Sequence, residues 1–203
     1  MVAEKMIEPI QFKFERPSKT YTLEDYMRKE AKSACKHEFI TGKMIRLPNT
    51  KAPHNIIASN MMIQMGMAFE IMEKDYTIFN SDQKVYFPSL DEGVYADALA
   101  VSQRPVYWDK SQLLLTNPIL IVEVLSKRTE KYDKSGKFHK YKTLDSFQEY
   151  ILIRQDMCYA EVWFRAKQGV WHETIIRDLD AQMVLKSVDI AISMRRIYKN
   201  IQF

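Results

Sequence analysis

The sequence predicts an α/β fold in which a central mixed β-sheet is flanked by helices. Three features indicate it: a helical spacing over residues 53–74, several strand-like segments after it, and an apolar run over residues 119–125 that is typical of an interior strand. No repeat, low-complexity segment or long linker divides the chain. We therefore expect an N-terminal arm over residues 1–18 and a single domain over residues 19–203.

The composition is that of an ordinary globular chain. Its 203 residues are 46% hydrophobic and carry a net charge of +4, which excludes disordered and fibrous classes. The five glycines stand too far apart for a Walker-type loop or a GxGxxG fingerprint, so no nucleotide cofactor of those types is expected. The two cysteines form no CxxC pair, which argues against a structural zinc site or a disulfide framework.

The chain also lacks the pattern of a targeting or membrane segment. Its first residues, MVAEKMIEPIQF, include acids and a proline where a signal peptide needs an apolar stretch. The longest apolar run, residues 119–125, is interrupted by Glu123. We expect a cytoplasmic protein without a membrane span.

The first half of the chain predicts a helix, a hairpin and a long helix. Thr22 can cap a helix through about Ser33, with acidic residues in the first turn. The segments HEFI and KMIRLP flank a Thr41-Gly42 turn, which predicts a hairpin with Glu38 on its first strand. Residues 53–74 follow with a proline in the first turn of the helix.

The second half is rich in strands. A helix-like interval over residues 132–143 separates two groups of them, and the last group is expected to form antiparallel strands near the C-terminus. The predicted strands are KVYF at 84–87, VYADALAV at 94–101, PILIVEVL at 118–125, EYILIR at 149–154, CYAEVWFR at 158–165 and VWHETIIRD at 170–178.

Two carboxylates interrupt these apolar strands. Glu123 lies within residues 119–125, and Asp97 is the only charge in residues 94–101. Burying an ionised group costs several kcal/mol or more unless a cation, a raised pKa or a metal ion compensates. For either acid alone, a salt bridge to a nearby Lys or Arg is the simpler interpretation. Two acids on neighbouring strands would make a divalent-cation site, and their oxygen ligands favour Mg²⁺ or Mn²⁺ over zinc.

A basic segment follows the Glu123 strand directly. Residues 127–142 contain seven Lys or Arg and two acids, a net +5 that exceeds the charge of the whole chain. Such a run is usually a solvated surface, but its place beside Glu123 favours a nucleic-acid contact. The expected nucleic-acid-binding residues are Lys127, Arg128, Lys131, Lys134 and Lys140.

Several stretches together resemble the Uma-two family of restriction-endonuclease-like proteins, within the PD-(D/E)XK superfamily and abundant in cyanobacteria. The matching stretches are YTLEDYM, HEFITGKMIRLP with Pro53-His54, SDQKVYFP, YADALAV and NPILIVEVLSKRTEKYDKSGKFHKY with EYILI. The resemblance implies a restriction-endonuclease-like core with an extra N-terminal hairpin. Two positions depart from the superfamily pattern: Leu125 stands at the lysine of ExK, and Ala96 stands at the proline before Asp97.

The resemblance also implies a set of site residues. Asp97 and Glu123 would hold the metal, Glu38 would add a carboxylate, and Lys137 would replace the missing ExK lysine. These four residues form the expected catalytic set. The second-tier residues are His54, which matches a family histidine but could cap or pack instead; Gln83, for which a cross-strand hydrogen bond is the simpler use; and Asp133.

The leading hypothesis is a Mg²⁺-dependent DNA endonuclease that hydrolyses phosphodiester bonds through a variant PD-(D/E)XK site. Because cleavage of both DNA strands requires two active sites, we expect a homodimer. The alternative is a non-catalytic nucleic-acid-binding or regulatory protein that retains the nuclease scaffold. A third possibility is an interaction scaffold with a salt-bridged core.

Overall fold

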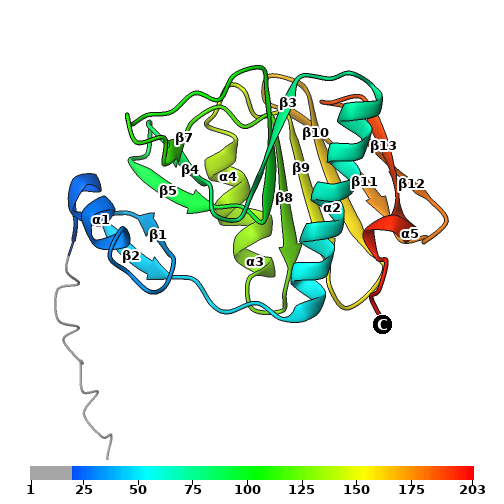
Figure 1. The fold of residues 1–203 in the computed structure, drawn as a ribbon, viewed down its shortest axis with the longest axis horizontal. Coiled ribbons are helices and arrows are strands. Elements are labelled where there is room, and N and C mark those ends of the chain that lie inside the picture. The colour runs from blue at the N-terminus through cyan, green and yellow to red at the C-terminus, as the bar shows by residue number, and fades with distance from the viewer. Residues whose placement is uncertain (1–19) are drawn as a thin grey trace, which may run out of the picture.

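The computed structural model describes residues 20–203, so the predicted arm over residues 1–18 lies outside the described residues (Figure 1). The helices are α1 (Leu23–Glu30), α2 (Ala52–Ile71), α3 (Glu130–Tyr132), the π-helical segment η1 (Asp133–Lys137), α4 (Phe138–Tyr141) and α5 (Met194–Ile197). The strands are β1 (His37–Ile40), β2 (Lys43–Arg46), β3 (Tyr76–Asn80), β4 (Lys84–Phe87), β5 (Glu92–Tyr95), β6 (Ala98–Ser102), β7 (Leu114–Leu115), β8 (Leu120–Leu125), β9 (Glu149–Arg154), β10 (Ala160–Lys167), β11 (Val170–Ile176), β12 (Gln182–Leu185) and β13 (Ile190–Ser193). None of the helices in residues 20–203 is both long enough and apolar enough to cross a bilayer.

The strands form mixed sheets, as the sequence predicts. A six-stranded sheet has the order β11-β10-β9-β8-β6-β3, and a five-stranded sheet has the order β2-β1-β5-β4-β7. The β8–β9 and β4–β7 pairs are parallel, whereas the other strand pairs in residues 20–203 are antiparallel. The C-terminal strands β9, β10 and β11 form the expected antiparallel group. The fold class predicted from the sequence is confirmed.

Local signals place the N-terminal elements. The Thr22 side chain accepts a hydrogen bond from the Asp25 backbone N–H at 3.1 Å, so Thr22 caps α1 as predicted. The helix ends at Glu30, three residues before the predicted end. Thr41 and Gly42 have positive φ angles of 47° and 72°, which is the backbone that a tight two-residue hairpin turn requires.

The predicted strand over residues 94–101 is wrong in one respect, because it is two strands in two different sheets. Strand β5 ends at Tyr95 in the five-stranded sheet, and β6 begins at Ala98 in the six-stranded sheet. Between them, the Asp97 backbone N–H donates to the Val122 carbonyl at 3.1 Å. The apolar pattern continues across the break because both sheets are buried here, so periodicity alone cannot reveal it.

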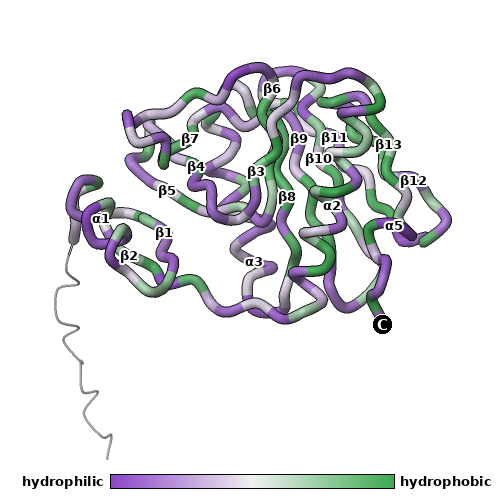
Figure 2. The backbone as a smooth tube through the Cα atoms, viewed as in Figure 1, coloured by the Kyte–Doolittle hydropathy of each residue, from purple (hydrophilic) through white to green (hydrophobic). Residues whose placement is uncertain are grey.

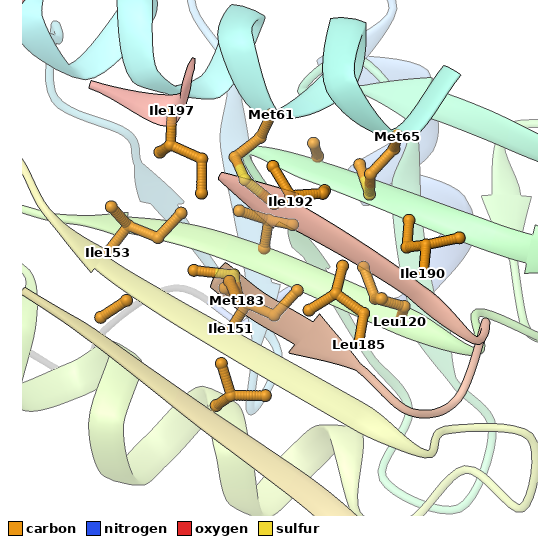
Figure 3. Close-up of a cluster of buried hydrophobic side chains, with 14 of the residues drawn as sticks. Met61, Met65, Leu120, Ile151, Ile153, Met183, Leu185, Ile190, Ile192 and Ile197 are labelled. Carbon is orange, nitrogen blue, oxygen red and sulfur yellow. The ribbon is translucent and has the colours of Figure 1, made fainter. Parts of the chain in front are cut away.

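The main hydrophobic core lies between the six-stranded sheet and the layer formed by α2, α5 and the β12–β13 hairpin (Figure 3). Met61 and Met65 of α2 face Ile190 and Ile192 of β13 and the side chains of the central strands. Met61 and Met65 thus fill the core, whereas Met67 of the same helix is exposed. Figure 2 shows hydrophobic colouring along β8, the strand that contains Glu123.

A second core lies on the opposite face of β8. The buried aromatic side chains Phe138, Tyr141, Phe147 and Tyr150 pack there against Leu125. Because side chains alternate along a strand, Glu123 points to this same face as Leu125. The α3–η1–α4 layer therefore covers Glu123.

Candidate active site

Glu123 is held by a lysine from the covering helical layer. The Lys137 Nζ lies 3.0 Å from each carboxylate oxygen of Glu123, and the Tyr141 hydroxyl donates to Oε1 at 3.2 Å. Lys137 also donates to the Tyr95 carbonyl at 2.9 Å. Glu123 is 2% exposed and Lys137 is 6% exposed, so this is a buried ion pair. Lys137 is thus the salt-bridge partner of Glu123, and it is also the lysine that the family resemblance offers in place of the missing ExK lysine.

A π-helical turn brings Lys137 and Asp133 to the same side. Both residues are buried, and Lys137 Nζ lies 3.4 Å from Asp133 Oδ1. A Cβ atom added to Gly136 in this turn would lie 2.6 Å from the Tyr132 ring, so glycine allows Tyr132 to fold back over the turn. Wider π turns of this kind occur mostly as single turns and often at functional sites. The sequence predicts a helix here and carries no signal for the π turn.

Glu38 approaches Lys137 from the N-terminal hairpin. It is the second residue of β1, it is 2% exposed, and its Oε1 lies 3.6 Å from Lys137 Nζ. This buried oxygen has no hydrogen-bond partner among the described residues. Lys137 therefore faces three carboxylates from three different parts of the chain.

The charges of this cluster do not balance. Burial lowers the pKa of Lys137, but the three carboxylates around it have the larger effect and raise that pKa well above its usual value. Burial raises the pKa of Glu123 well above its usual value and also raises the pKa values of Glu38 and Asp133, while Lys137 acts in the opposite direction. One ammonium group cannot neutralise three ionised carboxylates, so the cluster favours either protonation of an acid or the binding of a cation.

Asp97 lies next to β8, at the junction between the two sheets. Its Oδ2 accepts a hydrogen bond from the Val124 backbone N–H at 2.7 Å and lies 3.2 Å from His54 Nε2. His54 is in the first turn of α2 and is 9% exposed. Burial lowers the pKa of His54, but the hydrogen bond and charge of Asp97 outweigh it and raise that pKa. His54 thus orients Asp97 in this structure.

Two adjoining cavities open onto these side chains. The first has a volume of about 490 Å³ and is lined by Asp97, Glu123, His54, Asp133 and Lys137 among others. The second has a volume of about 270 Å³, and Glu38 lines it instead of Asp97 and Glu123. The structure thus brings Asp97 and Glu123 to one cavity, whereas Glu38 lines the other, and Lys137 lines both.

The donor set of the first cavity fits Mg²⁺ or Mn²⁺ bound by few protein ligands. Within residues 20–203, no group of three His, Cys, Asp or Glu side chains is arranged to hold a metal ion. The expected set of Asp97, Glu123 and Glu38 is therefore not preformed, because Glu38 lines the other cavity. Mg²⁺ usually keeps several waters and binds through one or two carboxylates, which Asp97 and Glu123 can supply. Excess buried negative charge is also what a bound cation would relieve.

The remaining predicted residues lie outside the first cavity. Gln83 does not line the first cavity, and its side chain donates to the backbone carbonyls of Lys84 and Leu113 rather than across two strands. Lys134 pairs with Glu161 at 2.5 Å, and Lys140 pairs with Glu92. Their charges are balanced within the fold. Of the five residues expected to bind nucleic acid, Lys127, Arg128 and Lys131 are exposed and make no ion pair with another described residue.

Two residues that line the second cavity were not predicted from the sequence. They are Tyr132, whose hydroxyl is buried without a hydrogen-bond partner among the described residues, and Arg46, the last residue of β2. A single arginine at the end of a hairpin strand carries no sequence signal. Tyr132 precedes Asp133 in the basic segment, where a tyrosine in a predicted helix gives no sign of a functional role.

A comparison with protein-family models decides the family. The model of Uma2, described as "Putative restriction endonuclease", matches residues 23–195. The chain belongs to the Uma2 family. The matched range contains both cavities of this Uma2 protein and all the residues around Lys137.

Individual relatives agree with this assignment. Uncharacterized protein sll1609 of Synechocystis sp. is 35% identical over 142 residues, which cover 70% of this Uma2 chain and 78% of that protein. Uncharacterized protein slr1290 of the same organism is 27% identical over 184 residues, covering 89% and 92% of the two chains. A crystal structure from Anabaena variabilis, described as a "putative nuclease belonging to DUF820", has a TM-score of 0.69 at 18% identity and covers 87% of this chain and 97% of that chain. This likeness shows that the two proteins share a fold.

Proposed function

We propose that this Uma2 protein is a divalent-metal-dependent DNA endonuclease. The observation that supports the proposal best is the convergence of Asp97, Glu123 and Lys137 on one cavity. A pair of carboxylates with an adjacent lysine is the residue chemistry that metal-assisted phosphodiester hydrolysis needs. The family description and the nuclease description of the structural relative point to the same class of reaction.

In this proposal Asp97 and Glu123 would hold Mg²⁺ or Mn²⁺, which would neutralise charge at the phosphate and activate a water molecule. His54 and the Val124 backbone N–H hold the Asp97 carboxylate in place. Lys137 keeps its proton because three carboxylates surround it, so it acts as a fixed positive charge beside the reacting phosphate. Glu38 and Asp133 hold the Lys137 ammonium group in position through contacts of 3.6 and 3.4 Å.

Plasmid cleavage tests this function directly. Supercoiled plasmid is incubated with wild type, Glu123→Gln and Glu173→Gln at a series of Mg²⁺ and Mn²⁺ concentrations. Glu173 is exposed on β11, so Glu173→Gln makes the same chemical change away from the cavity. We expect cleavage by wild type and Glu173→Gln only with metal, and a loss of about 100-fold or more in Glu123→Gln. Equal cleavage by all three proteins would exclude the site, and no cleavage by any of them would exclude the activity.

A non-catalytic DNA-binding protein is the second candidate. It is favoured by the Lys137–Glu123 contact, which engages both oxygens that a metal would use. Such a protein would bind DNA with an affinity that falls steeply with salt and does not respond to Mg²⁺. Parallel binding and cleavage assays on one preparation separate the two candidates.

The homodimer, the cytoplasmic location and the single domain over residues 19–203 stay predictions of the same proposal. Sedimentation of the purified chain with and without DNA measures the oligomeric state. A dimer with one active site in each copy would allow cleavage of both strands.

A further inference from the structure

The two cavities are neighbouring openings onto one side-chain cluster. They share five lining residues, namely Leu47, Pro48, Thr129, Asp133 and Lys137. Figure 1 shows why: the connection that leaves β2 towards α2 runs past α3. A ligand in one cavity therefore lies next to a ligand in the other.

The two cavities differ in charge. Three carboxylates line the first cavity together with Lys137, Lys36 and His54. Lys36 is paired with Asp82 at 2.6 Å outside that lining, and His54 contacts Asp97. Cationic side chains are in the majority in the second cavity, where Arg46, Arg128 and Lys137 face two carboxylates. The first cavity is suited to a cation and the second to an anion.

Arg46 and Arg128 are the free charges of the second cavity. Both are exposed, and neither side chain makes an ion pair or a hydrogen bond with another described residue. The carboxylates of Glu38 and Asp133 lie 3.6 and 3.4 Å from Lys137, so both form ion pairs with that lysine rather than with the two arginines. Most other cations near the site are already paired, as Lys134 and Lys140 illustrate.

The floor of the second cavity also has unused polar groups. The Tyr132 hydroxyl and Oε1 of Glu38 are both buried and make no hydrogen bond of normal length and angle in residues 20–203, although the two side chains are close enough to raise or lower each other's pKa. Buried polar atoms are seldom left without a partner in a native fold. A phosphate oxygen between the arginines could accept a hydrogen bond from Tyr132, and planar guanidinium groups match phosphate geometry.

We propose that the second cavity binds a backbone phosphate of DNA through Arg46 and Arg128, adjacent to the phosphate that the Asp97–Glu123 cavity would receive. This site rests on the proposed function for its ligand, and it adds a second contact point that sets how the strand crosses the protein. The strand would pass over Leu47 and Pro48, which line both cavities.

DNA binding without metal tests the phosphate site independently of catalysis. The affinity of wild type and Arg46→Ala/Arg128→Ala for a short fluorescein-labelled DNA duplex is measured by anisotropy in EDTA at several salt concentrations. The control is Lys110→Ala/Lys167→Ala, which removes the same charge from two exposed lysines that line neither cavity. We expect the arginine variant to bind about tenfold or more weakly, and to lower the slope of log K against log salt by about 2, one for each lost phosphate contact.

Conservative replacement separates charge from geometry. Arg46→Lys/Arg128→Lys should recover most of the salt slope but less of the affinity, because lysine cannot make paired hydrogen bonds to a phosphate. Unchanged melting temperatures in all variants would show that the fold is intact.

The outcomes distinguish this site from the proposed activity. Weak binding by the arginine variant, with no cleavage by wild type in any metal, would support the phosphate site and exclude the endonuclease. Wild-type affinity and slope in the arginine variant, an equal loss in the lysine control, or no DNA binding by wild type would overturn the phosphate site.

Discussion

Lys137 Nζ lies 3.0 Å from both carboxylate oxygens of Glu123, although one residue belongs to a π-helical turn and the other to the central strand β8. The pair is buried, and Lys137 also lies within 3.6 Å of Glu38 and 3.4 Å of Asp133. Removing one partner of a buried pair usually costs more than the pair contributes, because the other charge is left unpaired. The stability of the fold therefore depends on both partners of this pair being present.

Lys137→Met should destabilise the fold strongly, because three buried carboxylates lose their common cation. We expect the free energy of unfolding in urea to fall by about 3–5 kcal/mol. Lys131→Met, in the same segment but exposed, is the matched control and should change stability by less than about 0.5 kcal/mol. Adding Glu123→Gln to Lys137→Met should recover part of the loss, and strictly additive effects would contradict the coupling.

Gly136→Ala should disturb the π turn, because the new Cβ would lie 2.6 Å from the Tyr132 ring. We expect a loss of about 1–3 kcal/mol in unfolding free energy. Gly66→Ala in α2 is the control, since the new Cβ would contact only Ile78, at an ordinary 3.7 Å. This substitution should stabilise the protein by about 0.5–1 kcal/mol, because alanine favours the helix more than glycine does. Tyr132→Ala combined with Gly136→Ala should relieve the clash. A Gly136→Ala variant as stable as wild type would show that Tyr132 moves away freely.

Lys84 should make stability depend on pH. It is 4% exposed, and burial lowers its pKa from its ordinary value of 10.5 to about 8. Between pH 8 and 10.5 the unfolded chain binds more protons at this lysine, so wild type gains stability from Lys84 as the pH rises. Below pH 8 the wild type has to bury a protonated Lys84, which costs about 3 kcal/mol. Lys84→Met avoids this cost, so it should be more stable than wild type at pH 7. The gain is reduced by the loss of the cation–π contacts of Lys84 with Tyr26 and Tyr95.

Urea unfolding of the two proteins at pH 7, 9 and 10.5 measures this difference. The stability gap should close as the pH approaches 10.5. A gap that does not change with pH would mean that Lys84 is not protonated differently in the two states.

Mg²⁺ should stabilise the wild type against heat if Asp97 and Glu123 bind it. At a hundred times the dissociation constant the gain is about 2.7 kcal/mol, which raises the melting temperature by several degrees. Asp97→Asn should lose this shift. Asp75→Asn, an exposed aspartate outside both cavities, should keep it. An equal shift in all three proteins would locate metal binding elsewhere.

Much of the local structure could be predicted from residues close together in the chain. The cap at Thr22, the turn at Thr41-Gly42 and the strand that contains Glu123 depend on side chains within a few positions, so their patterns carry enough information. The sheet change at Asp97 was missed because both strands around it are buried, and the π turn was missed because Asp133 and Lys137 also fit an ordinary helix.

The sequence by itself determined which residues can carry charge inside this protein: two acids in apolar segments and a lysine-rich segment after them. The family resemblance added Lys137 as the partner. Only the tertiary structure decided that Lys137 pairs with Glu123, whereas Lys134 and Lys140 pair with other acids. It also decided that Glu38, Arg46 and Arg128 line the second cavity together. The physical reason is that these contacts join residues far apart in the chain. Their distances depend on sheet register and helix packing, which no local pattern encodes.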